Sequence, residues 1–123
     1  MKADQDVNIS MAPQSSRGTI VVVEDPFITG FLRSILARKG YLVMSLEALE
    51  GAAMLRCEDQ KVALLITNHP SAFTEFSQRV PLLYLAAFPE PEMAAPFRAS
   101  RLLPKPFQTD QFMSCVEELV HSM

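Results

Sequence analysis

The feature that most constrains the fold is an alternation of short apolar runs with amphipathic stretches along the 123 residues of the chain. The first run, residues 20–23, is continuously apolar and mostly β-branched, which is typical of a central strand covered on both faces. Asp25 and Pro26 follow it and predict a helix N-cap with proline at the first helical position. Gly40 predicts the end of that helix. Its apolar side chains fall at helical spacing: Ile28, Phe31, Leu32 and Ile35.

Four later apolar runs predict further strands, over residues 41–46, 62–67, 82–86 and 101–103. Residues 47–57 predict an alanine-rich helix, and the end of the chain predicts another. The apolar face of this last helix comprises Phe112, Cys115, Val116, Leu119 and Val120.

The two remaining connections have room only for short helices. About two turns are predicted around Phe73 and Phe76, and a helix after the fourth strand is expected to be short or broken by Pro96. Strands that alternate with helices predict an α/β domain in which a five-stranded parallel sheet lies between helices.

Composition excludes several classes of protein. With 49% hydrophobic and 20% charged residues, the chain can bury a core, and we expect one domain over residues 19–123 after a flexible tail over residues 1–18. The net charge is −3 and the Lys and Arg residues do not cluster, which argues against a nucleic-acid partner. No apolar run has membrane-spanning length and no signal peptide is visible, so we expect a cytoplasmic protein without a membrane partner.

Several side chains that often carry chemistry are assigned ordinary structural roles. Cys57 and Cys115 lack metal-site or redox spacing and are predicted to be buried, reduced thiols. His69 and His121 have no ligand partners at metal spacing and are predicted to lie in a loop and on a helix surface. The phenylalanines at helical spacing are predicted to belong to the core: Phe27, Phe31, Phe107 and Phe112.

The strand ends carry the side chains that suggest a site. In an open parallel sheet, ligands bind beyond the carboxyl ends of the strands, where the strand order reverses. The first strand ends in Glu24 and Asp25, the third in Asn68, and the fifth runs into Lys105. Two adjacent acids that face a lysine across a cleft could hold a divalent cation through oxygen ligands.

Four motifs at these positions resemble the receiver domains of two-component response regulators. They are VVVED at the first strand, LLITN at the third, LLYLAA at the fourth and PKPF before the last helix. The resemblance covers residues 18–123 and implies a flavodoxin-like (βα)5 fold with strand order 2-1-3-4-5, in which the third and fourth helices are short.

The resemblance also implies roles for individual positions. Glu24 and Asp25 match the acidic pair that helps to bind magnesium, and Lys105 matches the lysine that contacts the phosphoryl group. The bond between Lys105 and Pro106 matches a peptide bond that is often cis in the family. Asn68 falls where the family places its phosphoacceptor aspartate.

Two further positions depart from the family pattern. Ala86 stands where the family has a serine or threonine hydroxyl, and Leu102 takes the place of a switch aromatic. A carboxamide is a feeble nucleophile compared with the carboxylate that phosphotransfer needs, and no other acid can take the place of Asn68 at the strand end. Thr67 has a hydroxyl, but alternation points it to the opposite face of the sheet.

These departures predict a pseudo-receiver that is not an enzyme and that works by phosphorylation-independent protein–protein interaction. The resemblance points to a kinase, an output domain or a second copy as partner, and to the fourth helix, fifth strand and fifth helix as the interaction face. Magnesium binding is expected to be weak or absent, because a carboxylate is lost, and Lys105 is expected to pair with Glu24 or Asp25.

Simpler roles would also account for these residues. N-capping alone would suffice for Asp25, a turn for Asn68, and ordinary surface charge for Glu24 and Lys105. Two alternatives in function stay open as well, a working phosphorelay receiver with atypical chemistry and a small-ligand sensor in the vacated cleft.

Overall fold

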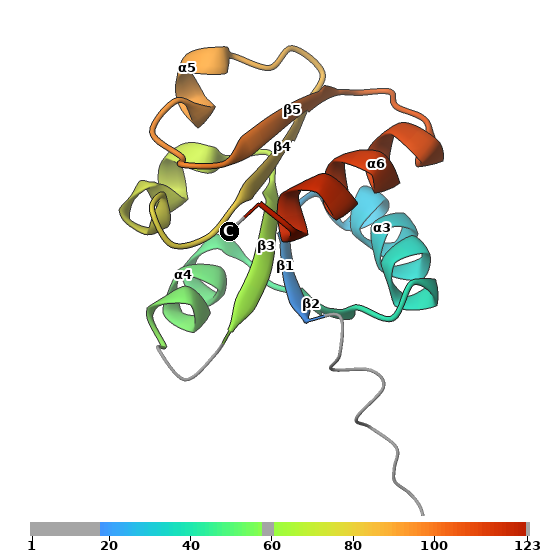
Figure 1. The fold of residues 1–123 in the computed structure, drawn as a ribbon, viewed down its shortest axis with the longest axis horizontal. Helices are drawn as coiled ribbons and strands as arrows, with labels where there is room; N and C mark the ends of the chain where they lie inside the picture. Colours follow the sequence, from blue (N-terminus) through green and yellow to red (C-terminus); the bar gives the residue numbers. More distant parts are fainter. Residues whose placement is uncertain (1–17, 58–60, 123) are drawn as a thin grey trace, which may run out of the picture.

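A parallel sheet of five strands forms the centre of the computed structural model, which describes residues 18–57 and 61–122. The strands are β1 (Thr19–Val23), β2 (Leu42–Ser45), β3 (Val62–Thr67), β4 (Leu82–Ala86) and β5 (Ser100–Pro104). They follow the order β2-β1-β3-β4-β5, with every pair parallel, so the predicted sheet and its strand order are confirmed (Figure 1). The predicted tail lies outside the described residues except for Gly18.

Helical segments connect the strands on both faces of the sheet. They are α3 (Pro26–Arg38), α4 (Ala48–Arg56), η2 (Pro70–Phe76), α5 (Pro91–Ala94) and α6 (Thr109–Val120). The segments after β3 and β4 are short, as predicted, and η2 is a 3₁₀ helix with a kink at Phe73 instead of an α-helix.

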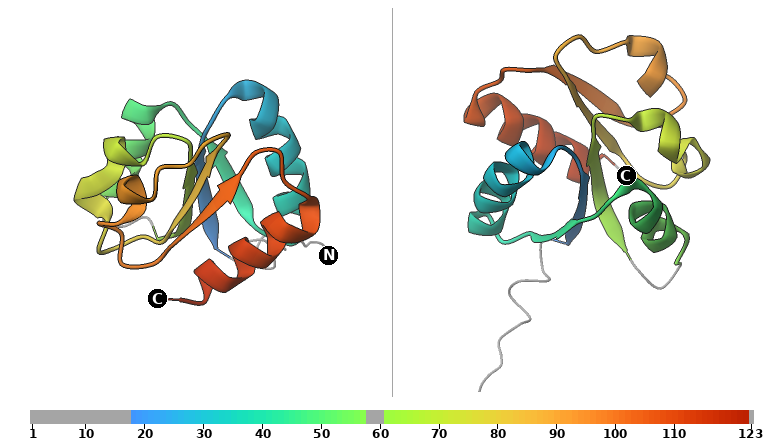
Figure 2. Two further views of the ribbon diagram at one scale, coloured as in Figure 1. Left: turned by 90° about the horizontal axis from the view of Figure 1, so that it is seen from above. Right: turned by 180° about the vertical axis from the view of Figure 1, so that it is seen from behind.

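Two layers of helices cover the sheet. Helices α3 and α6 lie side by side on one face, and α4, η2 and α5 lie on the other (Figure 2). Alternate residues of the central strands point into each layer, so that Val22 packs toward α3 and α6 while Val21 packs toward α4 and η2. Burial on both faces accounts for the continuous apolar runs of the central strands.

The start of α3 fixes the direction in which the chain leaves β1. Asp25 is the N-cap, and its Oδ1 accepts a hydrogen bond from the Phe27 amide at 2.9 Å, as the Asp25–Pro26 pair predicted. The helix ends at Arg38, two residues before Gly40, which has a φ of 92°.

Two predictions about the core are wrong. Phe27 is 95% exposed and Phe31 is 48% exposed, whereas Leu32 and Leu36 carry the buried face of α3. With 3.6 residues per turn, Phe27 and Phe31 lie on one stripe of the helix, and the buried stripe begins one residue later at Ile28.

Phe107 and Phe112, the other two phenylalanines predicted for the core, lie closer to it. Phe112 is fully buried, and the half-buried ring of Phe107 stacks on it with centroids 5.6 Å apart.

The prediction of buried thiols is also wrong for Cys57, which is exposed at the C-cap of α4, while Cys115 is half-buried. Cys57 is the C-cap after Arg56, and its extended backbone (φ −76°, ψ 109°) takes it off the helical stripe that carries the buried Ala52 and Leu55.

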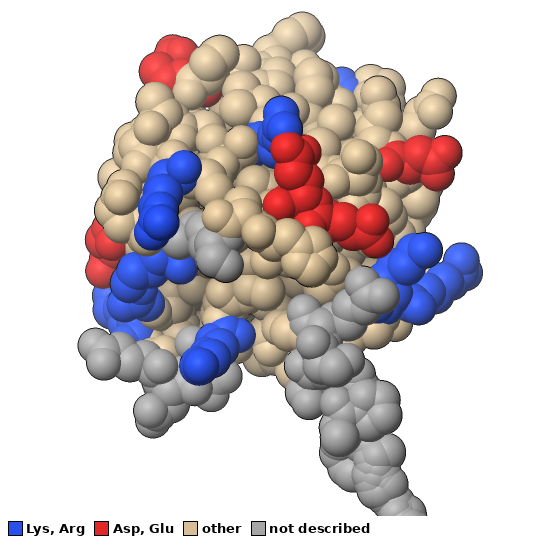
Figure 3. All heavy atoms as spheres, viewed as in Figure 1, with Lys and Arg blue, Asp and Glu red and all other residues tan. Residues whose placement is uncertain are grey.

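No helix in the described part of the chain is long and apolar enough to cross a membrane. On the face shown in Figure 3, acidic and basic side chains are interspersed with uncharged surface.

Candidate functional site

The carboxyl ends of β1, β3 and β5 bring the predicted site residues to one edge of the sheet. β1 pairs with β2 on one side and with β3 on the other, so the chain reverses its direction of winding at β1. Glu24 and Asp25 follow β1, Asn68 follows β3 and Lys105 follows β5. This is the switch point at which doubly wound sheets bind ligands.

Glu24 and Lys105 form an ion pair across this edge. The Lys105 Nζ lies 3.0 Å from Glu24 Oε2 and donates a hydrogen bond of 3.2 Å to Oε1. The Glu24 side chain is fully buried, whereas that of Lys105 is 26% exposed. The expected pairing of Lys105 is therefore present, with Glu24 as its partner, and the interpretation of Glu24 as an ordinary surface charge is wrong.

The Glu24 carboxylate has a second donor. Its Oε1 also accepts a hydrogen bond of 2.8 Å from the Asp25 backbone amide. The other oxygen, Oε2, is buried and contacts the Lys105 ammonium without the geometry of a hydrogen bond. One buried oxygen therefore keeps acceptor capacity beside the Lys105 ammonium.

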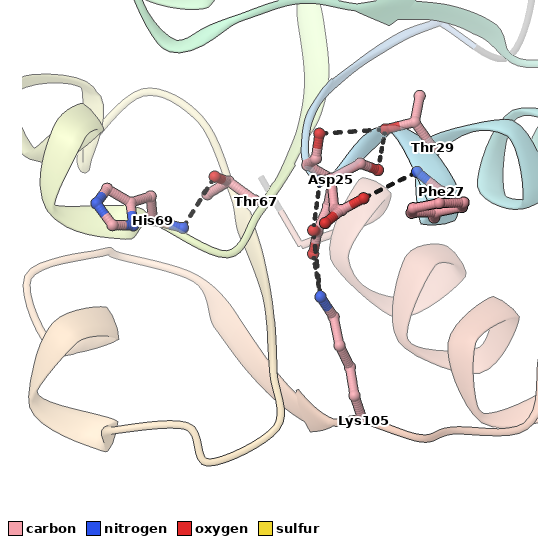
Figure 4. A network of polar contacts seen from close by, with 7 residues as sticks. Asp25, Phe27, Thr29, Thr67, His69 and Lys105 are labelled. Atoms are coloured by element: carbon pink, nitrogen blue, oxygen red, sulfur yellow. Dashed lines mark hydrogen bonds and ion pairs between the residues drawn. The ribbon is translucent and has the colours of Figure 1, made fainter.

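Asp25 is exposed and points its carboxylate toward its own helix (Figure 4). The Thr29 hydroxyl donates to the Asp25 backbone carbonyl at 3.0 Å, one turn below the cap. The capping role of Asp25 is thus visible in the structure, with Oδ1 engaged by the Phe27 amide.

The end of β3 presents a neutral edge. Asn68 is exposed in the loop, and Thr67 is fully buried on the α4 side of the sheet, as alternation predicted. The Thr67 Oγ1 accepts the His69 amide at 3.0 Å, which holds the turn after the strand (Figure 4). His69 itself is exposed, and so is His121 at the end of α6, both as predicted.

The two departing positions lie on β4 and β5. The Ala86 carbonyl accepts the Lys105 amide at 2.8 Å, so the position of the missing hydroxyl and the lysine are neighbours through the backbone. The peptide bond between Lys105 and Pro106 is cis, as expected. Leu102 is half-buried opposite Tyr84 of β4, which is itself buried in the same layer of the core.

The segment after Asn68 is fixed by apolar anchors. Pro70 and Phe73 are buried, and the Phe73 ring lies close to Gly51 of α4, where an added Cβ would come within 3.4 Å of Cε1. Outside this packing, the exposed Arg56 guanidinium hydrogen-bonds to Glu75 and lowers the pKa of that carboxyl. The short helix thus packs onto α4 and holds the end of β3 in place.

Beside the ion pair lies a polar groove of about 500 Å³ between α3 and the start of α4. Its walls include residues that sequence reasoning missed: Thr29, Arg33 and Ser45. The Arg33 Nη2 donates to Ser45 Oγ at 2.7 Å across the groove. Of these three, only the position of Thr29 could be anticipated from the sequence, because a hydroxyl four residues after an N-cap commonly hydrogen-bonds to the backbone of the preceding turn.

No protein-family model and no curated protein matches the chain. Solved structures do match. The receiver domain of the sensor histidine kinase PA1611 from Pseudomonas aeruginosa PAO1, which has magnesium coordinated in its active-site cleft, superimposes with a TM-score of 0.70 at 20% identity. That match covers 85% of this chain and 98% of the other.

Two further structures agree. A response regulator receiver protein from Sinorhizobium medicae WSM419 gives a TM-score of 0.68 at 18% identity over 85% and 94% of the two chains. The beryllofluoride-activated receiver domain of NtrC gives 0.67 at 23% identity over 88% and 98%. The chain therefore has the flavodoxin-like receiver fold.

Proposed function

We propose that the chain is a receiver-type module of two-component signalling that is not phosphorylated on an aspartate and acts through protein–protein interaction in the cytoplasm. The observation that carries the proposal is the neutral, exposed Asn68 at the end of β3, beside a buried ion pair between Glu24 and Lys105. Aspartyl phosphotransfer needs an anionic oxygen nucleophile and a lysine that is free to neutralise phosphoryl charge. Here the anion is missing, and the lysine is already engaged.

Magnesium fits this site poorly. In residues 18–57 and 61–122, no three His, Cys, Asp or Glu side chains gather as a metal site would require. Three side chains offer oxygen ligands at this edge: Glu24, Asp25 and Asn68. Glu24 is paired with Lys105, Asp25 caps α3, and Asn68 offers only a neutral amide oxygen. The PA1611 receiver holds magnesium in its cleft, and we propose that the present site binds it weakly or not at all.

Exposed apolar side chains support an interaction role. Phe27 opens α3 after β1, Leu49 opens α4 after β2, and Phe88 follows β4, with exposed fractions of 95%, 87% and 89%. Contiguous apolar patches on a surface mark interaction sites, and these three side chains all follow the carboxyl ends of strands, on the same edge of the sheet as Asn68. A kinase, an output domain or a second copy is the kind of partner we propose, at this edge or at the neighbouring face of α5, β5 and α6.

A chemical phosphodonor tests the absence of phosphorylation. Incubation of the full chain with acetyl phosphate and magnesium is expected to leave its intact mass unchanged, because Asn68 offers no carboxylate to attack the donor. The NtrC receiver domain, treated in parallel, serves as the positive control. A covalent phosphoryl adduct that maps to residues near the end of β3 would contradict the proposal.

A further inference from the structure

Strand β2 is one of the two edges of the described sheet, and part of its backbone faces outward (Figure 1). The Leu42 amide donates to the Gly18 carbonyl at 3.1 Å. In a parallel ladder, alternate residues bond to opposite neighbours, so the amides and carbonyls of Val43 and Ser45 point away from β1. Within the described residues, no strand pairs with β2 on that side. This edge therefore has donors and acceptors for another strand.

The opposite edge, β5, carries a residue that blocks such pairing. The Lys105 amide donates to the Ala86 carbonyl at 2.8 Å, so Pro104, which precedes Lys105, has its nitrogen on the outward side of β5. Proline has no amide hydrogen, and proteins use it to keep a further strand from the edge of a sheet. The sequence of β2 is LVMS, which contains neither proline nor a charged residue. The sheet thus protects β5 and leaves β2 open.

An apolar groove of about 470 Å³ lies along this open edge, between β2 and α4. Alternate residues of the β2 segment line it, namely Leu42, Met44 and Leu46. The Leu42 side chain is 50% exposed. On the other face of the strand, the Ser45 hydroxyl accepts a hydrogen bond from Arg33. A strand that pairs with this edge therefore needs apolar side chains at alternate positions toward α4, which is the pattern of β2 itself.

A two-fold axis through Met44 supplies such a strand from a second copy of the chain. Antiparallel pairing about this axis places Val43 opposite Ser45 of the second copy, and the two residues exchange both of their N–H···O bonds. The axis repeats this pair on its other side. Toward α4, Leu42 lies opposite Leu46 of the second copy, and the two Met44 side chains lie opposite each other. The outward backbone groups and the apolar side chains of β2 are thus matched together.

The charges at the two ends of β2 are complementary in the same arrangement. Arg38 is the last residue of α3 before β2, and Glu50 lies in the first turn of α4 after it. The register about Met44 brings Arg38 to the level of Glu50 of the second copy, and the reverse. Neither side chain forms an ion pair within the described residues, where the Glu50 Oε1 accepts only the Glu47 amide. Complementary charges of this kind fix register and favour the correct partner.

We propose that two copies of the chain form a symmetric dimer by antiparallel pairing of β2 with β2, about a two-fold axis at Met44. The sheets join into one continuous sheet, and the same surface serves both copies, as in most closed dimers. Main-chain hydrogen bonds supply affinity, and the alternate apolar side chains supply specificity. The dimer gives one specific partner to the interaction role proposed above, and it rests on that role.

Analytical ultracentrifugation of the full chain over a range of concentrations tests the dimer. The wild type is expected to show a reversible monomer–dimer equilibrium. Val43→Pro removes an outward amide that β1 does not use, and it should raise the dimer Kd at least about tenfold, because each dimer loses that bond twice. Ser100→Pro is the matched control: it lies on the outward side of β5, since the Leu82 amide bonds to the preceding Ala99 carbonyl, and it should leave Kd unchanged.

A side-chain variant at the axis keeps the test independent of proline. Met44→Lys places two ammonium groups opposite each other, and like charges in that position oppose strand pairing. Its Kd should also rise at least about tenfold, whereas Met44→Leu, which keeps an apolar side chain, should stay within about twofold of the wild type. Far-UV circular dichroism confirms that each variant is folded.

The charges at the ends of β2 give a third readout. Arg38→Glu places like charges at the level of Glu50 of the second copy, so it should weaken the dimer several-fold at low salt and less at high salt. Arg98→Glu makes the same change at an exposed position between α5 and β5, away from the dimer surface, and should leave Kd unchanged.

Two results would overturn the proposal. A wild-type chain that stays monomeric up to millimolar concentration would show that β2 does not recruit a second copy. A dimer whose Kd is the same in wild type, Val43→Pro and Met44→Lys would place the contact on another surface. The acetyl phosphate test is separate: a monomer without a phosphoryl adduct would refute the dimer alone, whereas an adduct on a β2-paired dimer would refute only the absence of phosphorylation.

Discussion

Replacing Phe73 by alanine is expected to lower the free energy of unfolding by about 3–5 kcal/mol. The Phe73 side chain is fully buried in the layer formed by α4, η2 and α5, and it packs against Gly51. Truncation would lose the burial of the ring and leave a cavity between η2 and α4, next to β3, which Asn68 follows. Urea denaturation monitored by far-UV circular dichroism measures the change.

Phe88→Ala is the matched control for this prediction. It makes the same substitution at a side chain that is 89% exposed, and it should change the free energy of unfolding by no more than about 0.5 kcal/mol. Equal effects of the two substitutions would show that Phe73 does not anchor the segment after β3.

Replacing Lys105 by methionine is expected to destabilise the fold by about 2 kcal/mol. This is less than the cost of breaking a fully buried ion pair, because the Lys105 side chain is 26% exposed to solvent. The methionine keeps most of the aliphatic stem but removes the ammonium, so the buried Glu24 carboxylate keeps only the Asp25 amide as a donor. Glu24→Gln should cost less, about 1 kcal/mol, because the released ammonium can turn toward water.

A double-mutant cycle separates the pair from its surroundings. The combination of Glu24→Gln with Lys105→Met should cost clearly less than the sum of the single changes, because the buried charge and its partner are removed together. Lys39→Met, at an exposed position after α3, is the control for loss of a lysine charge. Strict additivity of Glu24→Gln and Lys105→Met would argue that the two side chains do not interact.

Much of the fold follows from local patterns. The continuous run of residues 20–23, the Asp25–Pro26 pair and the stop near Gly40 predict β1 and α3 closely, because each depends on the residues that form it. All five strands are likewise predicted, and the predicted ends of β1, β2 and β5 differ from the observed ones by one residue.

The failures concern which way side chains face. Phe27 and Phe31 were expected in the core because they have helical spacing, but spacing defines a stripe without saying which stripe meets the sheet. Cys57 follows the last residue of α4, so the helical spacing that buries Leu55 no longer applies to it. The 3₁₀ form of η2 also needs tertiary packing, since Phe73 has a non-helical φ and is held by its burial.

The site was predictable as a set of residues but not as a set of contacts. Strand ends and motifs bring Glu24, Asp25, Asn68 and Lys105 to one edge, and the structure does place them there. The local sequence does not determine whether Lys105 forms its ion pair with Glu24 or with Asp25. The partner depends on the N-cap of α3 and on the packing of β1 against its neighbours. Arg33 and Ser45 meet only because α3 packs beside β2.

The measurement that tests the central claim most directly is a titration of wild-type chain and Asn68→Asp with magnesium and beryllofluoride, followed by the thermal midpoint. We expect no change for the wild type and a saturable rise for Asn68→Asp, which regains the third carboxylate. A saturable rise in the wild type that Asp25→Ala abolishes would contradict the account, because it would show a cleft that binds metal and the phosphoryl analogue despite Asn68.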